Sequence, residues 1–123
     1  MKLRFRRNSL RLRVNQLEVR SLANGTAVTE EVLFPGNVRM TYALQPSRED
    51  SPQANYDSGN ISVCAPEHLV RDWAEGNGIG LYFELPAGNS VLSVAIEKDL
   101  ECIDGPEEEK DPDAFPRTAE KAC

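Results

Sequence analysis

The sequence predicts a small α+β domain in which two similar strand–helix–strand–strand units share one core. Short apolar runs alternate with polar residues at a period of two, which is typical of strands with one buried face. Two other segments carry apolar residues at i, i+3 and i+4, which is typical of one helix face. Both patterns recur in the same order in each half of the 123 residues, which indicates a pair of related units.

The N-terminal segment predicts two strands that share a basic face. Residues 2–7 and residues 10–14 each alternate between apolar and basic side chains, and the turn pair Asn8-Ser9 lies between them. We expect a hairpin or two neighbouring strands whose apolar side faces the core. The basic positions on the other side are Lys2, Arg4, Arg6, Arg11 and Arg13.

A helix is predicted to follow, with Asn15 as its N-cap. Glu18, three residues later, completes a capping-box pattern, and Gly25 supplies a residue that can end the helix in the left-handed region. Residues 26–34 and 38–44 return to strand character, with a Pro-Gly-Asn turn between them.

The second half shows the same order after a polar, turn-rich stretch. Residues 45–59 predict a surface loop, within which a short strand around Tyr56 is left open. Strand, helix and two strands then recur, and a shift of 51 residues places Gly76 on Gly25. The repeat units are therefore placed at residues 10–44 and 61–97.

The units are expected to form one closed domain rather than an array. Residues 1–100 are assigned to this domain, with residues 2–7 as an extra N-terminal strand, two short helices, and a mostly antiparallel or barrel-like sheet. Residues 101–123 are predicted to be an acidic, mobile tail, because they are rich in Pro, Asp and Glu. Within this tail, residues 113–116 suggest an anchor, with Phe115 docking in an apolar groove.

Charge and composition narrow the function classes. The net charge is −6 and the sequence pI about 4.8, which disfavours a general affinity for nucleic acid or anionic membranes. Residues 1–20 nevertheless carry seven basic side chains against one acidic one, and residues 101–115 carry the reverse. No apolar run reaches the roughly 20 residues that span a membrane, and no signal peptide is recognised. An odd number of cysteines, three, then predicts reduced thiols in the cytoplasm.

The basic strand face is the candidate site, because guanidinium groups offer fixed forks for carboxylate or phosphate. Lys2, Arg4, Arg6, Arg11 and Arg13 are the predicted ligand-binding residues. The alternative is a solvated face, or one neutralised by the acidic tail or by the acidic residues Glu30, Glu31, Glu84 and Glu97.

No catalytic residue, metal or cofactor is predicted. Cys64 and His68, with Cys102 or Cys123, are candidate zinc ligands, but the paired spacing of structural zinc sites is missing. The run from Gly76 through Gly80 follows a predicted helix rather than a strand, so it is not a dinucleotide-binding loop.

Two resemblances add expectations. The opening M-K-L-R-F-x-x-N-S-L-R-L-R-V, with Glu97 to Cys102 and residues 113–116, resembles a family of small uncharacterised bacterial proteins, which implies no assigned activity. Strand, Pro66, short helix and Gly76 are similar to the looped-hinge domains of transition-state regulators and antitoxins. That second resemblance implies a dimer that binds DNA.

These observations favour a non-enzymatic binding module whose basic face holds an anionic small molecule or an acidic protein segment. A looped-hinge-like DNA-binding regulator is the first alternative. A small enzyme that uses carboxylates such as Glu84 and Glu97 in a cleft is the second. A homodimer stays open, and the sequence identifies neither the ligand nor the partner.

Overall fold

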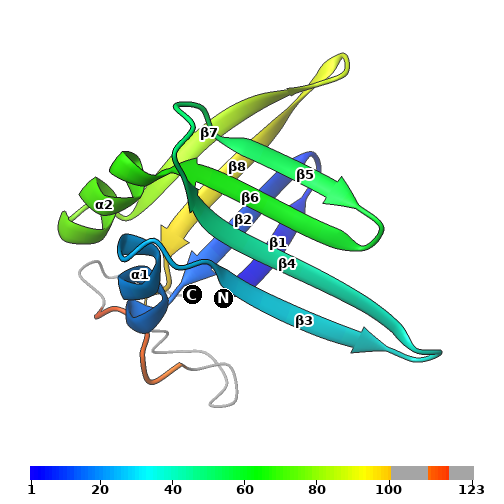
Figure 1. The fold of residues 1–123 in the computed structure, drawn as a ribbon, viewed down its shortest axis with the longest axis horizontal. Helices are drawn as coiled ribbons and strands as arrows, with labels where there is room; N and C mark the ends of the chain where they lie inside the picture. Colours follow the sequence, from blue (N-terminus) through cyan, green and yellow to red (C-terminus); the bar gives the residue numbers. More distant parts are fainter. Residues whose placement is uncertain (101–110, 117–123) are drawn as a thin grey trace.

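The computed structural model describes residues 1–100 and 111–116, and within them the chain forms eight strands and two helices. Figure 1 shows the two helices side by side at one end of the strands. In chain order the elements are β1 (Lys2–Arg6), β2 (Ser9–Val14), α1 (Gln16–Ala23), β3 (Val28–Phe34), β4 (Val38–Ser47), β5 (Gln53–Asp57), β6 (Asn60–Pro66), α2 (Glu67–Glu75), β7 (Gly80–Ala87) and β8 (Ser90–Lys98).

The strands form two mixed sheets, and each half of the chain contributes one hairpin to each sheet. Sheet A has the order β1-β2-β8-β7, and sheet B has the order β3-β4-β6-β5. The hairpins are antiparallel, whereas the central pairs β2–β8 and β4–β6 are parallel. The predicted α+β class with two short helices and mostly antiparallel pairing is therefore confirmed, but the two sheets do not close into a barrel.

The predicted N-terminal strand is present as β1, and the strand that the sequence left open around Tyr56 is its counterpart in the second unit. The stretch around Tyr56 forms β5, so a leading strand precedes the second unit as well as the first. In β5 the side chain of Ala54 packs against the core, while its neighbours in the strand are polar. A single inward-facing apolar residue does not produce a recognisable period-two pattern, so the sequence alone could not establish this strand. The element order β-β-α-β-β thus occurs twice, while a duplicated origin stays a prediction.

The turns of the two leading hairpins also correspond. Arg7 in the β1–β2 turn has a φ of 52°, and Ser58 in the β5–β6 turn, 51 positions later, has a φ of 50°. Residues with a Cβ atom rarely adopt the left-handed region of backbone conformation. Both turns are therefore held in it by the pairing of the strands on either side.

The first helix begins as the sequence predicts. The Asn15 side chain accepts a hydrogen bond from the Glu18 backbone N–H, and the Glu18 carboxylate accepts one from the Asn15 N–H, which completes the capping box. The second helix has Pro66 as its N-cap and no side-chain hydrogen bond there.

The core lies between the two sheets and under the helices. Each central strand contributes fully buried side chains, and each helix turns one apolar face inward. Trp73 of α2 also donates a hydrogen bond of 2.9 Å from Nε1 to the carbonyl of Ile79, which satisfies its polar edge within the core. The principal buried side chains are Leu12, Val14, Val19, Leu22, Leu44, Val63, Val70, Trp73, Val94 and Ile96.

Residues 111–116 lie against the start of α1. The Gln16 N–H donates to the carbonyl of Asp113 at 3.0 Å, and the Phe115 N–H donates to the carbonyl of Asp99 at 2.7 Å. The Phe115 ring packs against the core, as expected for the predicted anchor. The predicted mobility of residues 101–110 and 117–123 concerns parts that lie outside the described residues.

The docking of this segment is expected to weaken in acid. The Asn15 amide donates to the Asp111 carboxylate at 2.9 Å and holds the pKa of Asp111 below its usual value of 3.8. A carboxyl with a lowered folded pKa contributes stability above its unfolded pKa and loses it as the pH falls through the folded one. The stability difference between the parent and Asp111→Asn should therefore shrink below pH 3.8 in denaturant titrations. If the difference in free energy of unfolding between the two proteins does not change with pH, the ionised carboxylate of Asp111 does not stabilise the docked segment.

Candidate anion-binding groove

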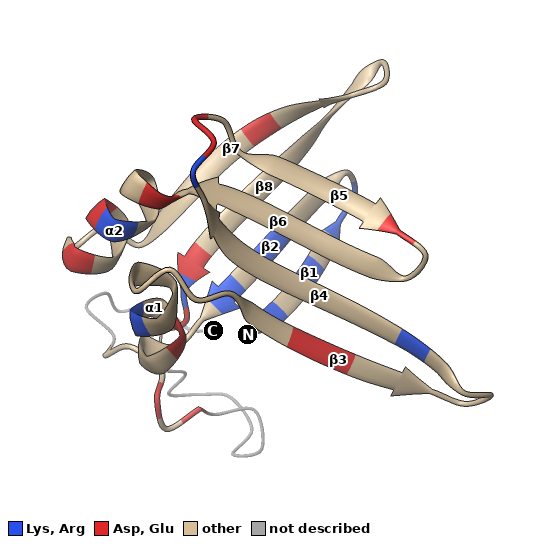
Figure 2. Cartoon of the chain, viewed as in Figure 1, with Lys and Arg blue, Asp and Glu red and all other residues tan. Residues whose placement is uncertain are grey.

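Strand pairing places the five predicted basic residues on one face of sheet A. In the register of β1 and β2, Lys2 lies opposite Arg13 and Arg4 lies opposite Arg11. Side chains directly opposite each other point to the same face, so the stripe faces away from the core. Figure 2 shows the basic positions gathered on β1 and β2, whereas β3 of the other sheet carries acidic ones.

Part of the stripe is neutralised, as the alternative interpretation expected. Lys2 Nζ lies 2.8 Å from Asp99 Oδ2. Arg11 Nε and Arg13 Nε lie 3.1 Å and 3.8 Å from the same oxygen of Glu97, whose side chain is only 15% exposed. These ion pairs hold Lys2, Arg11 and Arg13 along the sheet.

Of the other predicted acidic partners, Glu30 and Glu31 lie away from the stripe. Glu30 pairs with the amino group of Met1 at 3.2 Å, and Glu31 pairs with Arg39 on sheet B at 3.0 Å. Glu84 lies on the same face as the stripe, on the far strand β7.

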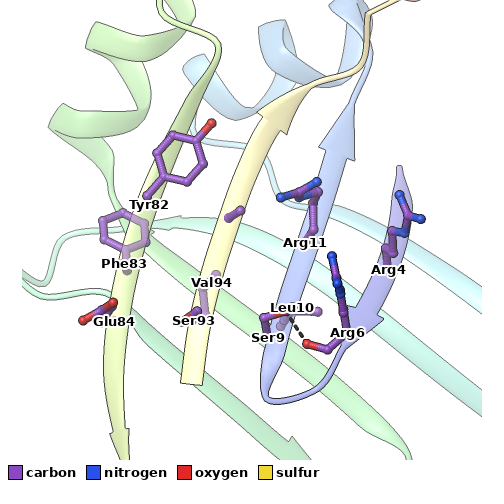
Figure 3. A pocket seen from close by; sticks show the side chains of 11 residues that line it. Arg4, Arg6, Ser9, Leu10, Arg11, Tyr82, Phe83, Glu84, Ser93 and Val94 are labelled. Carbon is purple, nitrogen blue, oxygen red and sulfur yellow. Dashed lines mark hydrogen bonds between the residues drawn. The ribbon is translucent and has the colours of Figure 1, made fainter. Parts of the chain in front are cut away.

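Arg4 and Arg6 differ from the rest of the stripe. Within residues 1–100 and 111–116, neither forms an ion pair. Both are exposed, and both line a groove of about 380 Å³ across the outer face of sheet A. Figure 3 shows Arg4, Arg6 and Arg11 on one side of this groove.

Besides the arginines, the groove is lined by small and polar residues together with the apolar Leu10, Phe83 and Val94. Ser9, Ser93 and Ala95 lie between the arginines and β7, so the middle of the groove stays shallow but open. Tyr82 and Glu84 form the opposite side (Figure 3). The formal charge of the lining is +2, from three arginines and one glutamate, on a chain of net charge −6.

Glu97 connects the two sides of the groove. Besides Arg11 and Arg13, its carboxylate accepts a hydrogen bond of 2.7 Å from the Tyr82 hydroxyl. This hydrogen bond raises the pKa of Tyr82 above its usual value, with a further contribution from burial. The same hydrogen bond holds the Tyr82 ring in place beside the groove.

Tyr82, Ser9 and Ser93 were not among the predicted site residues. Tyr82 alternates with Leu81 and Phe83 in β7, so its outward direction follows from the period-two pattern. Its position beside the arginines does not, because it depends on the pairing of β8 with both β2 and β7.

The candidate zinc ligands Cys64 and His68 belong to no metal-binding cluster in the described part of the chain. No group of three or more His, Cys, Asp or Glu side chains arranged to hold a metal occurs there. Cys64 is buried and accepts a hydrogen bond from the Gln45 amide at 3.1 Å. Cys102 and Cys123 lie outside the described residues. In the described part of the chain, neither α1 nor α2 is long and apolar enough to cross a membrane.

Fold and groove together define a two-sheet α+β protein with a basic surface groove. The chain belongs to a family of unknown function (DUF7009), whose model matches residues 1–119. The resemblance to an uncharacterised family is thereby confirmed, while the bacterial origin and the likeness to looped-hinge domains stay predictions. No curated protein and no solved structure matches the chain.

Proposed function

We propose that the protein is a binding module that holds a small anion in the groove of sheet A. The observation that carries the proposal is that Arg4 and Arg6 line a groove without an ion pair among the described residues. Guanidinium groups without a carboxylate partner are the groups best suited to hold phosphate or carboxylate with two hydrogen bonds each.

Two further features support this proposal. Arg11 is held by Glu97 through Nε at 3.1 Å, which orients its side chain beside the groove before a ligand arrives. The hydroxyl of Ser93 lies on the floor, where it can donate to the same anion, whereas the Ser9 hydroxyl donates to the carbonyl of Arg6 and holds the β1–β2 end of the groove (Figure 3). A small ligand suits the groove, because its volume lies at the lower end of the range for small-molecule sites.

Replacing Arg4 and Arg6 together should abolish most of the binding. Arg4→Ala/Arg6→Ala removes two charge-assisted contacts, so the affinity for inorganic phosphate or citrate should fall at least about tenfold. The measurement is a calorimetric titration at low ionic strength, supported by the rise in melting temperature with each anion. Both arginines are exposed, so the variant should keep its stability within about 0.5 kcal/mol.

Arg39→Ala/Arg48→Ala is the matched control. These two exposed arginines lie outside the groove, and their loss changes the net charge by the same amount. The control should bind the anions as the parent does. A parent that binds neither anion, or a control that loses binding equally, would refute the proposed site, since the second outcome indicates only a general charge effect.

A further inference from the structure

The groove has two chemically different ends. The strand register aligns Arg6, Ser9, Ser93 and Glu84 in one row across sheet A, from β1 through β2 and β8 to β7. The backbones at the two ends are three strand spacings apart, about 14 Å. A guanidinium therefore lies at one end of this row and a carboxylate at the other. Of the two serines between them, Ser9 donates its hydroxyl to the Arg6 carbonyl, so Ser93 is the one whose hydroxyl can meet a ligand.

The neighbouring row is also basic at its β1 end, but it ends in an aromatic side chain on β7. It aligns Arg4, Arg11, Ala95 and Tyr82. Tyr82 as a residue is 62% exposed, and its hydroxyl donates a hydrogen bond to Glu97. Next to the small Ala95, this ring offers a flat apolar surface on the β7 side, against which the carbon face of a ligand can pack.

Glu84 is the group at the β7 end that can select a ligand. It is exposed, lines the groove, and forms no ion pair within residues 1–100 and 111–116. A carboxylate accepts hydrogen bonds from hydroxyl or amino groups and repels a second anion. A ligand with anions at both ends would meet the arginines at one end and Glu84 at the other.

We infer that the ligand is a phosphate monoester whose far end carries hydroxyl or amino donors, and that Glu84 discriminates against a second phosphate. Its phosphate lies at Arg4 and Arg6, its donors reach Glu84, and its carbon skeleton crosses the serine and alanine floor. The inference rests on the proposed anion site and adds the chemistry of the other half of the ligand.

Fructose 6-phosphate and fructose 1,6-bisphosphate form a matched pair of probes, because a second phosphate replaces one hydroxyl. Titrations with both would give the ratio of their dissociation constants for the parent, for Glu84→Gln and for Glu49→Gln. Glu84→Gln removes the charge and keeps the shape, so its ratio should shift in favour of the bisphosphate by about tenfold. Glu49→Gln removes an exposed glutamate outside the groove and should leave the ratio unchanged.

The outcomes separate the two proposals. An unchanged ratio in Glu84→Gln, with binding of both sugars lost in Arg4→Ala/Arg6→Ala, would overturn the role of Glu84 and leave the anion site standing. An equal shift in Glu49→Gln would overturn it also, because net charge would then account for the effect. If the parent binds neither sugar but binds inorganic phosphate, the anion site stands and the ligand class is wrong.

Discussion

Gly80→Ala should destabilise the protein by about 2–3 kcal/mol, which is the cost of forcing atoms into a packed site. A Cβ at this position would lie 2.8 Å from the carbonyl oxygen of Ile96. It would also lie 2.9 Å from Cγ of Glu97 and 2.9 Å from the hydroxyl of Tyr82. The backbone oxygen belongs to the central strand β8 and cannot move away without disturbing the pairing with β2.

The substitution should also disturb the groove, because two of the three contacted atoms belong to the Tyr82–Glu97 pair. Displacing Glu97 releases Arg11, whose Nε it holds at 3.1 Å. We therefore expect weaker phosphate binding in addition to the lower free energy of unfolding, both measured on the folded variant at low temperature.

Gly78→Ala is the matched control within the same short segment. A Cβ there meets nothing within 4 Å, and the φ of Gly78 is not in the left-handed region. Its stability should stay within about 0.5 kcal/mol of the parent. Equal stability of Gly80→Ala and Gly78→Ala would show that the close approach at Gly80 is absent in solution.

This glycine illustrates where sequence reasoning succeeds and where it stops. The glycine run from Gly76 to Gly80 follows a helix rather than a strand, which excludes a dinucleotide-binding loop. Nothing in the local sequence, however, shows that Gly80 must lack a side chain. The requirement comes from Glu97 and Ile96, which β-sheet pairing brings beside it from the next strand. Contacts between strands depend on register, and register is not a local property of either segment.

The same distinction applies to the basic stripe. Alternation alone placed Lys2, Arg4 and Arg6 on one face, and the capping box at Asn15 fixed where the strand gives way to α1. The parallel pairing of β2 with β8 brought Glu97 onto two of the five basic residues. Parallel partners lie far apart in sequence, so the division of the stripe into paired and unpaired arginines could not be predicted.

Phe115→Ala should lower the free energy of unfolding by about 2 kcal/mol, less than for a fully buried phenylalanine because the ring is only partly buried. The ring packs against the core, and Nζ of Lys98 lies 5.5 Å from its centroid. Lys98 is 8% exposed and donates to the carbonyl of Gly76 at 2.9 Å. Burial lowers the pKa of Lys98, so removing a ring that attracts the ammonium leaves this buried cation less well compensated.

Two further variants identify the origin of the effect. Phe115→Leu keeps an apolar side chain but removes the aromatic face, so it should recover part of the stability. The remaining loss contains the interaction with Lys98 and the packing of the larger ring. Phe5→Ala removes a ring that is 59% exposed and should cost less than Phe115→Ala. Denaturant titrations of the three variants give the comparison. If Phe115→Ala unfolds at the same denaturant concentration as the parent, residues 111–116 do not hold α1 and the end of β8 together in solution.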